Sequence, residues 1–431
     1  MKKGDGFKLT GNVVKIGVFG AGRGESYASM VNLTDAKVVA VCDALQEKAE
    51  RLKCNCAPDA VIYTDFNEFL THEMDAVILC NYFDEHAPYA IQAMKAGKHV
   101  MSECLSNITV AEGVELCRTA EATGMIYKLA ENYPYCASNM EMRRIYLGGS
   151  LGRVLYGEGE YIHPMKQRDR NQRSPGIKHW RSWIPATYYI THALAPLMYI
   201  TDAMPVEVNA RSVYAPELIK GTAASSGDAL GIVLCTMDNG ALFRVTGWAN
   251  MAGHGNWYRI NGTRGAVESV RGNQGNVMLG YNSWDIPEGA QAHSVYEAQW
   301  PSNAHLADKA GHGGGDFWVV HHFVESIKNG SQPYFNVYRA AAVSTAGLMG
   351  WRSVLNGGAP VKLPDFYSEE SRKQFENDRF VANPFADVPE ELRLPNSTTP
   401  GVHPGPGDLE EAYKDWEKCG FDVVADGRMG T

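Results

Sequence analysis

Three closely spaced glycines and a later acid form the first group of residues that could do chemistry. Gly20, Gly22 and Gly24 end an apolar, β-branched run that starts at Val13, and a second such run ends at Asp43. A glycine turn between a strand and a helix lets a pyrophosphate approach the backbone, and the N-terminal N–H groups of the helix favour its charge. An acid roughly 20 residues farther on is placed to bind a ribose. The pattern predicts NAD as cofactor, bound by Gly20, Gly22, Arg23, Gly24 and Asp43.

Polar residues follow three further apolar runs. Asn81 and His86 come after the run 75–80, Glu103 ends the run 99–103, and Glu131 and Asn132 end the run 125–132, with Tyr133 and Tyr135 directly behind. Ligands of a parallel sheet lie beyond the carboxyl ends of its strands. We therefore expect these side chains around one crevice, and we expect Asn81, His86, Glu103 and Asn132 to contact the cofactor.

A cationic segment lies near the middle of the chain. Only Asp169 opposes its basic side chains, which are Lys166, Arg168, Arg170, Arg173, Lys178, His179 and Arg181. A solvated charged loop would explain such a segment. In a chain of net charge −9, however, it is also a local positive patch. Because arginine and lysine hold carboxylates, sulfonates and phosphates, we expect an anionic sugar such as a uronate or a sulfo-sugar, with sulfoquinovose as one example.

The elements that must position these residues divide the chain into parts. Strands alternate with helices up to about residue 133, which predicts an N-terminal Rossmann domain (1–133) with a parallel sheet. Residues 134–366 carry alternating strands and hairpin turns, for example at Asp238-Asn239-Gly240, and predict an α+β domain with a large, mostly antiparallel sheet. The Pro-rich, charged extension 367–431 is expected to pack on the surface or on a neighbouring subunit.

Composition excludes several classes. The chain has 431 residues, 45% hydrophobic and 21% charged, as in ordinary globular proteins. It has no apolar run of about 18 residues, and its first twelve residues do not form a secretory signal. Nine scattered cysteines indicate a reducing, cytoplasmic compartment. The acidic balance argues against nucleic-acid and membrane partners. We expect no metal site.

The segments IGVFGAGRG, DAVILCNYFDEHAPYAIQAMKAGKHVMSE, LAENYPY and INGTRGAVES resemble the Gfo/Idh/MocA family of sugar oxidoreductases. The resemblance implies a Rossmann domain, a second domain on a largely antiparallel sheet, NAD(P), a sugar-like substrate and a homo-oligomer that pairs through its open sheet. One departure is clear. The family has Glu-Lys-Pro where this chain has Glu103-Cys104-Leu105, so the lysine that assists hydroxyl deprotonation is missing.

Within that family, several short motifs resemble the NAD-dependent glycoside hydrolases of the α-N-acetylgalactosaminidase type, which also lack the lysine. The motifs are Phe83-Asp84-Glu85-His86, Glu131-Asn132-x-x-Tyr135, Tyr161-x-His163, Trp180-Arg181, Tyr189-x-Thr191-His192 and Gly311-His312-Gly313-Gly314 with Asp316. The resemblance implies catalytic roles for Tyr135, Tyr189 and His192. From these motifs we expect substrate binding by His163, Trp180, Arg181 and His312, and from the cationic segment by Lys166, Arg168 and His179. Ile190 and Gly315 replace the usual proline and methionine, so substrate preference does not transfer.

Three activities agree with these residues. The first is an NAD-dependent glycoside hydrolase that oxidises the sugar at C3, eliminates the C1 substituent, adds water and returns the hydride. In it, His192 would deprotonate the C3 hydroxyl and Tyr135 or Tyr189 would handle the C2 proton. The second is a net sugar or glycoside 3-dehydrogenase, and the third is an NAD(H)-holding sensor without catalysis. Taken alone, His192 and both tyrosines could equally be packing residues, and His312 could lie in a plain turn.

Overall fold

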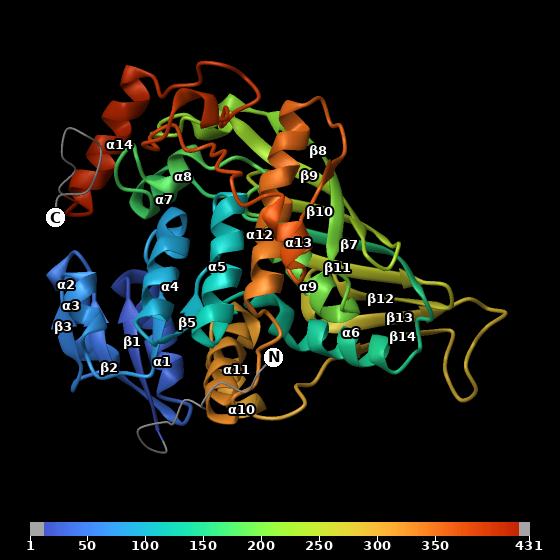
Figure 1. Ribbon diagram of the computed structural model, residues 1–431. Coiled ribbons are helices and arrows are strands. Elements are labelled where there is room, and N and C mark those ends of the chain that lie inside the picture. Colours follow the sequence, from blue (N-terminus) through green and yellow to red (C-terminus); the bar gives the residue numbers. More distant parts are fainter. Residues whose placement is uncertain (1–12, 422–431) are drawn as a thin grey trace.

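The computed structural model describes residues 13–421, apart from the side chains of Trp248 and Ala249. The first twelve residues, to which the expectation about a secretory signal applies, lie outside this range. A parallel sheet of strand order β3-β2-β1-β4-β5-β6 forms the N-terminal part (Figure 1). Its elements are β1 (Val14–Phe19), α1 (Ala21–Val31), β2 (Ala36–Cys42), α2 (Gln46–Cys56), β3 (Val61–Tyr63), α3 (Phe66–Leu70), β4 (Ala76–Leu79), η1 (Phe83–Glu85), α4 (His86–Lys95), β5 (His99–Ser102), α5 (Val110–Thr123), β6 (Tyr127–Leu129) and η2 (Tyr133–Tyr135).

Local sequence explains these elements. Apart from the edge strand β3, the strands are short apolar runs that are largely buried on both faces, as expected of a parallel sheet covered by helices. Helix α5 begins with a capping box, in which Thr109 accepts from the N–H of Glu112 and the Glu112 side chain accepts from the N–H of Thr109. Helix α1 begins at Ala21, because Gly20 adopts a left-handed φ of 90° and lets the chain turn directly into the helix.

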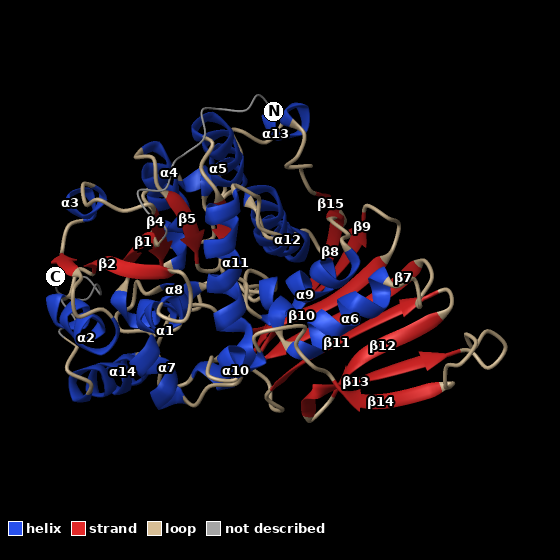
Figure 2. Cartoon of the chain, turned by 90° about the horizontal axis from the view of Figure 1, so that it is seen from below, coloured by secondary structure: helices blue, strands red, loops and turns tan. Residues whose placement is uncertain are grey.

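A nine-stranded sheet forms the second part, in the order β14-β13-β12-β11-β7-β10-β9-β8-β15 (Figure 2). Only the β7–β10 pair is parallel. The mostly antiparallel sheet and the Rossmann sheet confirm the predicted fold class. The elements are α6 (Ala137–Leu147), β7 (Val154–Ile162), α7 (Gln167–Arg173), α8 (Trp180–Trp183), α9 (Thr191–Thr201), β8 (Pro205–Tyr214), η3 (Pro216–Ile219), β9 (Asp228–Met237), β10 (Leu242–Ala249), β11 (Gly255–Gly262), β12 (Gly265–Val270), β13 (Asn273–Tyr281), β14 (His293–Glu297), α10 (Ala304–Ala307), η4 (His312–Gly314), α11 (Gly315–Asn329), α12 (Val337–Leu355) and β15 (Val361–Lys362).

Helices α6, α9 and α12 cover one face of this sheet (Figure 2). Helices α11 and α12 also pack on α1 and α5 of the first part, so the two parts share a continuous hydrophobic core. The start of α9 lies very close to β7, since a Cβ on Gly159 would be 2.1 Å from the carbonyl oxygen of Ala193. The small residue in the strand therefore sets the depth at which α9 presents His192.

The C-terminal extension contains α13 (Glu369–Lys373), η5 (Glu390–Leu392) and α14 (Pro406–Lys418). Helix α14 packs against α7, on the side where α7 approaches the Rossmann part (Figure 1). Trp416 is buried and donates to the carbonyl of Asn171 (2.9 Å), and the Asn171 amide donates to Asp415 (2.9 Å). The extension thus holds the helix that carries Arg170. The domain boundaries at 133 and 366 stay predictions.

Candidate active site

The glycine turn has the geometry that a dinucleotide needs. A Cβ on Gly20 would meet the backbone of Cys80 at 2.4 Å, and one on Gly24 would meet Val18 at 2.5 Å, so both positions serve close packing. At Gly22 no atom lies within 4 Å of such a Cβ, which leaves the backbone open to a ligand. Asp43 follows β2 and accepts from the N–H of Ala21 (2.7 Å), so the carboxylate lies beside the turn.

Further groups face the same edge of the sheet. Asn81 follows β4, and its buried Oδ1 has no hydrogen-bond partner; the same is true of Asn132 Oδ1 after β6. Buried amide oxygens without partners are costly and mark places where a ligand can donate. The open turn, the carboxylate and these oxygens fit NAD. His86 differs, because its two ring nitrogens lie against the carbonyls of Leu105 and Asn81 and its pKa is lowered by burial. It supports Asn81 and has no nitrogen left for a cofactor.

Arg23 is engaged within the protein. Its Nε donates to Glu103 (2.7 Å), and its two terminal nitrogens donate to Asp316 (2.7 and 3.0 Å). Burial alone would raise the pKa of Glu103, but Arg23 outweighs it and leaves that pKa below its usual value. Both Arg23 and Glu103, predicted as cofactor ligands, therefore form one ion-pair network that joins the glycine turn to α11.

A buried histidine–carboxylate pair lies at the centre of the crevice. His192, at the start of α9, bonds through Nδ1 to Oε1 of Glu131, which is fully buried after β6. The Cys104 thiol donates to the other oxygen of Glu131 (2.9 Å). Cys104 thus stands at the position of the missing lysine as a neutral donor, with a pKa raised well above normal by burial and by Glu131. Because Glu131 occupies Nδ1, Nε2 is the nitrogen of His192 left for proton transfer.

Three tyrosines surround His192. The ring centroids of Tyr133, Tyr161 and Tyr189 lie 4.9, 4.6 and 4.8 Å from that of its imidazole, all with edge contacts. Burial raises the pKa of Tyr133 to about 12 and also raises those of Tyr161 and Tyr189, so all three are neutral hydroxyl donors near pH 7. We call Tyr133, Tyr161, Tyr189 and His192 the aromatic box. It combines a base with apolar ring surfaces, which suits a sugar.

Tyr135 lies outside this box. It is 1% exposed, and it packs against Tyr199 and His322 while its hydroxyl accepts from Lys128 (3.2 Å). The structure therefore brings His192 and Tyr189 together and places Tyr133 where the resemblance suggested Tyr135. The catalytic role of Tyr135 stays a prediction, but no contact with His192 supports it.

Lys128 gives a stability prediction. It is fully buried on β6, and burial lowers its pKa from 10.5 to about 7. Between these two pH values Lys128 is protonated in the unfolded chain but largely neutral in the folded protein. Stability therefore rises with pH across that window, and the free-energy cost of burying Lys128 is greatest below pH 7. K128M should raise the free energy of unfolding, at about 1.4 kcal/mol per pKa unit removed. Urea unfolding at pH 6 and pH 9 measures this. The gain should be larger at pH 6, whereas exposed Lys37→Met should give none; a loss for K128M at pH 6 would contradict the prediction.

The remaining predicted substrate ligands divide into two groups. Trp180 stacks on Tyr189 (5.8 Å), Arg181 lies 4.0 Å over Trp180, and His179 and His163 flank Trp180 and Tyr161. His312 contacts Tyr133 (5.8 Å). These residues therefore gather at the aromatic box, whereas Lys166 and Arg168 are exposed.

Sequence reasoning gave no individual role to four residues that the geometry singles out. They are Glu131, Tyr133, Asp316 and Arg170. Glu131 and Tyr133 were expected in the crevice, because they directly follow a predicted buried strand. Arg170 is 7% exposed, and its Nε and Nη1 atoms have no partner. Nothing in the sequence separated it from its exposed neighbours Arg168 and Arg173.

Two family models match the chain. Residues 14–131 match the NAD-binding Rossmann fold of the oxidoreductase family Gfo/Idh/MocA, and residues 253–373 match the C-terminal domain of glycosyl hydrolase 109. A glycosyl hydrolase family 109 protein of Shewanella sp. is 26% identical over 395 residues, covering 82% of this chain and 85% of its own. The alpha-N-acetylgalactosaminidase of Shewanella oneidensis is 25% identical over 393 residues, with the same coverage.

Solved structures show the same fold. Levoglucosan dehydrogenase in complex with NADH and L-sorbose has a TM-score of 0.69 at 19% identity, covering 82% of this chain and 99% of its own. No helix among residues 13–421 is both long and apolar enough to cross a membrane. The N-terminal part of the chain is thus similar to the NAD-binding Rossmann fold of the Gfo/Idh/MocA oxidoreductases, and the C-terminal part is similar to the glycosyl hydrolase 109 domain.

Proposed function

We propose that the protein is an NAD-dependent glycoside hydrolase that oxidises a sugar transiently at C3, eliminates the C1 substituent, adds water and re-reduces the ring. The observation that carries this is the Glu131–His192 pair inside the aromatic box, at the edge of the sheet that also bears the glycine turn. The similarity to glycosyl hydrolase family 109 proteins supports the same activity.

The residues would divide the work as follows. NAD⁺, when bound, supplies the acceptor and donor of the hydride. The glycine turn and Asp43 would hold it, and Asn81 and Asn132 offer free acceptors beside it. His192 would remove the hydroxyl proton through Nε2, while Glu131 fixes the ring and stabilises the imidazolium, as a carboxylate does for a catalytic histidine. Tyr189 and Tyr133, whose rings contact the imidazole of His192, would supply a neutral hydroxyl for the C2 proton.

A net 3-dehydrogenase is the second candidate, because the same base would serve a dehydrogenase and levoglucosan dehydrogenase shares the fold. One assay separates the candidates. The protein is incubated with NAD⁺ and a panel of nitrophenyl glycosides in D₂O. Release of nitrophenol without net NADH, and with deuterium at C2 of the product, supports the hydrolase. Accumulating NADH supports the dehydrogenase. NADH binding without either supports a sensor and overturns the proposal.

For the substrate, we propose an anionic glycoside such as that of a sulfo-sugar or a uronate. Arg170 is buried, and burial together with Arg181 lowers its pKa to about 10. Arg181 lies over Trp180, whose ring stacks on Tyr189 of the aromatic box. Among the described residues no acid pairs with either guanidinium. Two like charges, the buried Arg170 and the half-buried Arg181, are costly side by side, and an anionic sugar substituent would neutralise both through charge-assisted hydrogen bonds.

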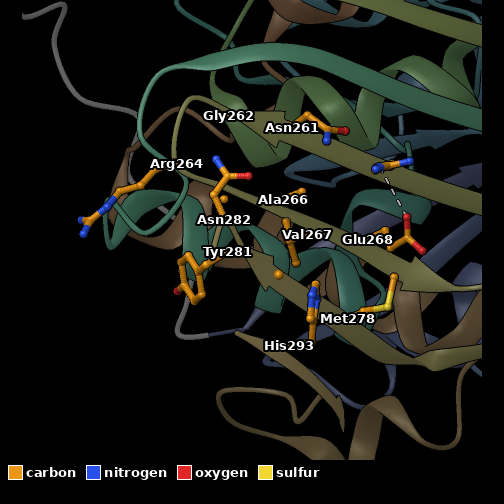
Figure 3. A pocket seen from close by; sticks show the side chains of 13 residues that line it. Asn261, Gly262, Arg264, Ala266, Val267, Glu268, Met278, Tyr281, Asn282 and His293 are labelled. Atoms are coloured by element: carbon orange, nitrogen blue, oxygen red, sulfur yellow. Dashed lines mark ion pairs between the residues drawn. The ribbon is translucent and has the colours of Figure 1, made fainter. Parts of the chain in front are cut away.

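We also propose a homo-oligomer formed through the open face of the large sheet. That face has exposed Leu234, Leu242 and Val295 and a shallow pocket of about 280 Å³, in which Arg259 pairs with Glu268 (Figure 3). Interleaved apolar and paired charged side chains suit a self-complementary surface. Light scattering of the protein at several concentrations tests this, and a monomer at all concentrations refutes it.

All nine cysteines are free thiols, which supports a reducing, cytoplasmic setting as a proposal.

A further inference from the structure

Three buried side chains around His192 form a set of ligands that metal ions prefer. Cys104 follows β5, Glu131 follows β6, and His192 is the second residue of α9. One ligand atom of each, a thiol sulfur, a carboxylate oxygen and an imidazole nitrogen, lies within 4.8 Å of the other two. Among residues 13–421 this is the only group of three histidine, cysteine or acidic side chains placed to share an ion. The three residues are 27 and 61 positions apart in the chain, so local spacing in the sequence does not indicate a metal site.

The donor set is typical of a zinc site. Thiolate, imidazole and carboxylate are the ligand types that Zn²⁺ takes in proteins, and three protein ligands leave a fourth position for water. A thiolate sulfur favours soft or borderline cations over Mg²⁺ and Ca²⁺, which prefer oxygen ligands. The thiolate of Cys104 and the carboxylate of Glu131 would together balance the charge of a divalent cation, which a buried site requires.

Hydrogen bonds among the three residues fix their ligand atoms. Nδ1 of His192 bonds to Oε1 of Glu131, and the Cys104 thiol donates to Oε2 (2.9 Å). The atoms that pair here are the same atoms that would bind a cation, so a cation could replace both hydrogen bonds with little movement of the side chains. Glu131 is fully buried, Cys104 is 3% exposed and His192 is 7% exposed. A cation would therefore enter from the crevice that His192 faces.

We propose that Cys104, Glu131 and His192 bind a thiophilic divalent cation such as Zn²⁺, and that the bound cation stops turnover. The block follows from the tautomer of His192. A cation on Nδ1 uses the lone pair of that nitrogen, so the ring proton resides on Nε2. Nε2 can then no longer accept a proton from a sugar hydroxyl. The inhibition rests on the proposed function, whereas the binding of the cation does not.

The exchange balances in protons and charge. The S–H proton of Cys104 leaves to solvent as the bond from Sγ to the metal forms, because a coordinating thiol is deprotonated. Nδ1 of His192 loses its proton and Nε2 gains one, so the imidazole stays neutral. Glu131 exchanges two accepted hydrogen bonds for a bond to the cation. No electron is transferred, so a chelator can remove the cation again.

Cobalt titration of the purified, NAD⁺-bound protein tests the site. Co²⁺ is the probe because a cobalt–thiolate bond gives a charge-transfer band in the near ultraviolet, whereas cobalt on oxygen and nitrogen ligands does not. A single Co²⁺ per chain should give this band, and Zn²⁺ should remove it. Cys104→Ser keeps a hydroxyl donor for Glu131 but should abolish the band. H192A should weaken cobalt binding by about 10²-fold, because even the outer partners of metal ligands are worth about 10–100-fold in affinity. The matched control C54S, at an exposed cysteine of α2, should keep the band.

Turnover measures the consequence of binding separately. Zn²⁺ should inhibit release of nitrophenol, EDTA should restore it, and Mg²⁺ should have no effect. Relative to its own metal-free rate, C104S should need about 10²-fold more Zn²⁺ for half inhibition, and NADH titration checks that this variant is folded.

Several results would overturn the inference. They are no band in the unaltered protein, a band that persists in C104S, or equal Zn²⁺ sensitivity of C104S and C54S. A band that depends on Cys104, together with undiminished turnover, would overturn the block at His192. If the unaltered protein turns over no glycoside, the proposed function fails, and the cobalt titration still decides whether the metal site exists.

Discussion

His192→Ala should lower kcat on any accepted glycoside by 10³-fold or more. General base catalysis by a positioned histidine contributes about 10²–10⁴-fold, and here no lysine of the Glu-Lys-Pro kind is present to substitute, since Cys104 stands at that position. The buried Glu131 would also lose its partner. NADH affinity should change little, because His192 is in the second part of the chain and not in the glycine turn. Steady-state kinetics and NADH titration measure both quantities.

Glu131→Gln tests the carboxylate partner of the Glu131–His192 pair. An amide can donate to Nδ1 and stabilise the wrong tautomer, so kcat should again fall by about 10²–10⁴-fold with the fold intact. His403→Ala, at an exposed position of the extension, should behave as the unaltered protein. A kcat within threefold of normal for H192A would rule out His192 as the base.

Arg170→Met should do two opposite things. Without ligand it should stabilise the protein by about 1–3 kcal/mol, because a buried guanidinium with two unpartnered nitrogens is replaced by an apolar side chain of similar length. With an anionic glycoside it should lower kcat/KM by about 30-fold or more, since a buried charged partner is typically worth 2–5 kcal/mol. Thermal unfolding and kinetics on paired anionic and neutral glycosides measure the two effects.

The control for Arg170 comes from its own helix. Arg168→Met removes an exposed charge two residues away and should leave stability and selectivity nearly unchanged. A destabilised R170M that loses activity equally on neutral and anionic glycosides would show that the guanidinium is structural. A stabilised R170M with full activity on the anionic glycoside would show that the anion binds elsewhere.

Much of the Rossmann part could be predicted because its signals are local. Strand–glycine turn–helix order and a terminal acid depend on neighbours in the chain, and β1, α1 and β2 lie where these signals indicated. The roles of the residues that the sequence did not reveal depend on which way each side chain points from a short helix. Tyr133 and Tyr135 lie two residues apart in a 3₁₀ turn of three residues, so their side chains point to different sides. Likewise, α7 turns Arg170 inward and Arg168 outward.

Long-range contacts could not be predicted at all. Asp316 and Arg23 are 293 residues apart in sequence, and neither segment indicates that the two side chains pair. Glu131 and Cys104 come from the ends of neighbouring strands, but their bond to each other and to His192 requires the depth at which α9 lies on the sheet. The types of residue in the crevice followed from sequence, whereas their pairing followed only from the packing of the two parts.

The packing of α14 on α7 has a practical consequence. Asn171 bonds to both Asp415 and Trp416, directly beside the guanidinium proposed to recognise the substrate's charge. Proteolytic clipping within α14 would therefore displace Arg170 and change which glycosides the site accepts. Recombinant proteins that differ only at the carboxyl end would then differ in substrate selectivity. Affinity tags are therefore better placed at the amino end.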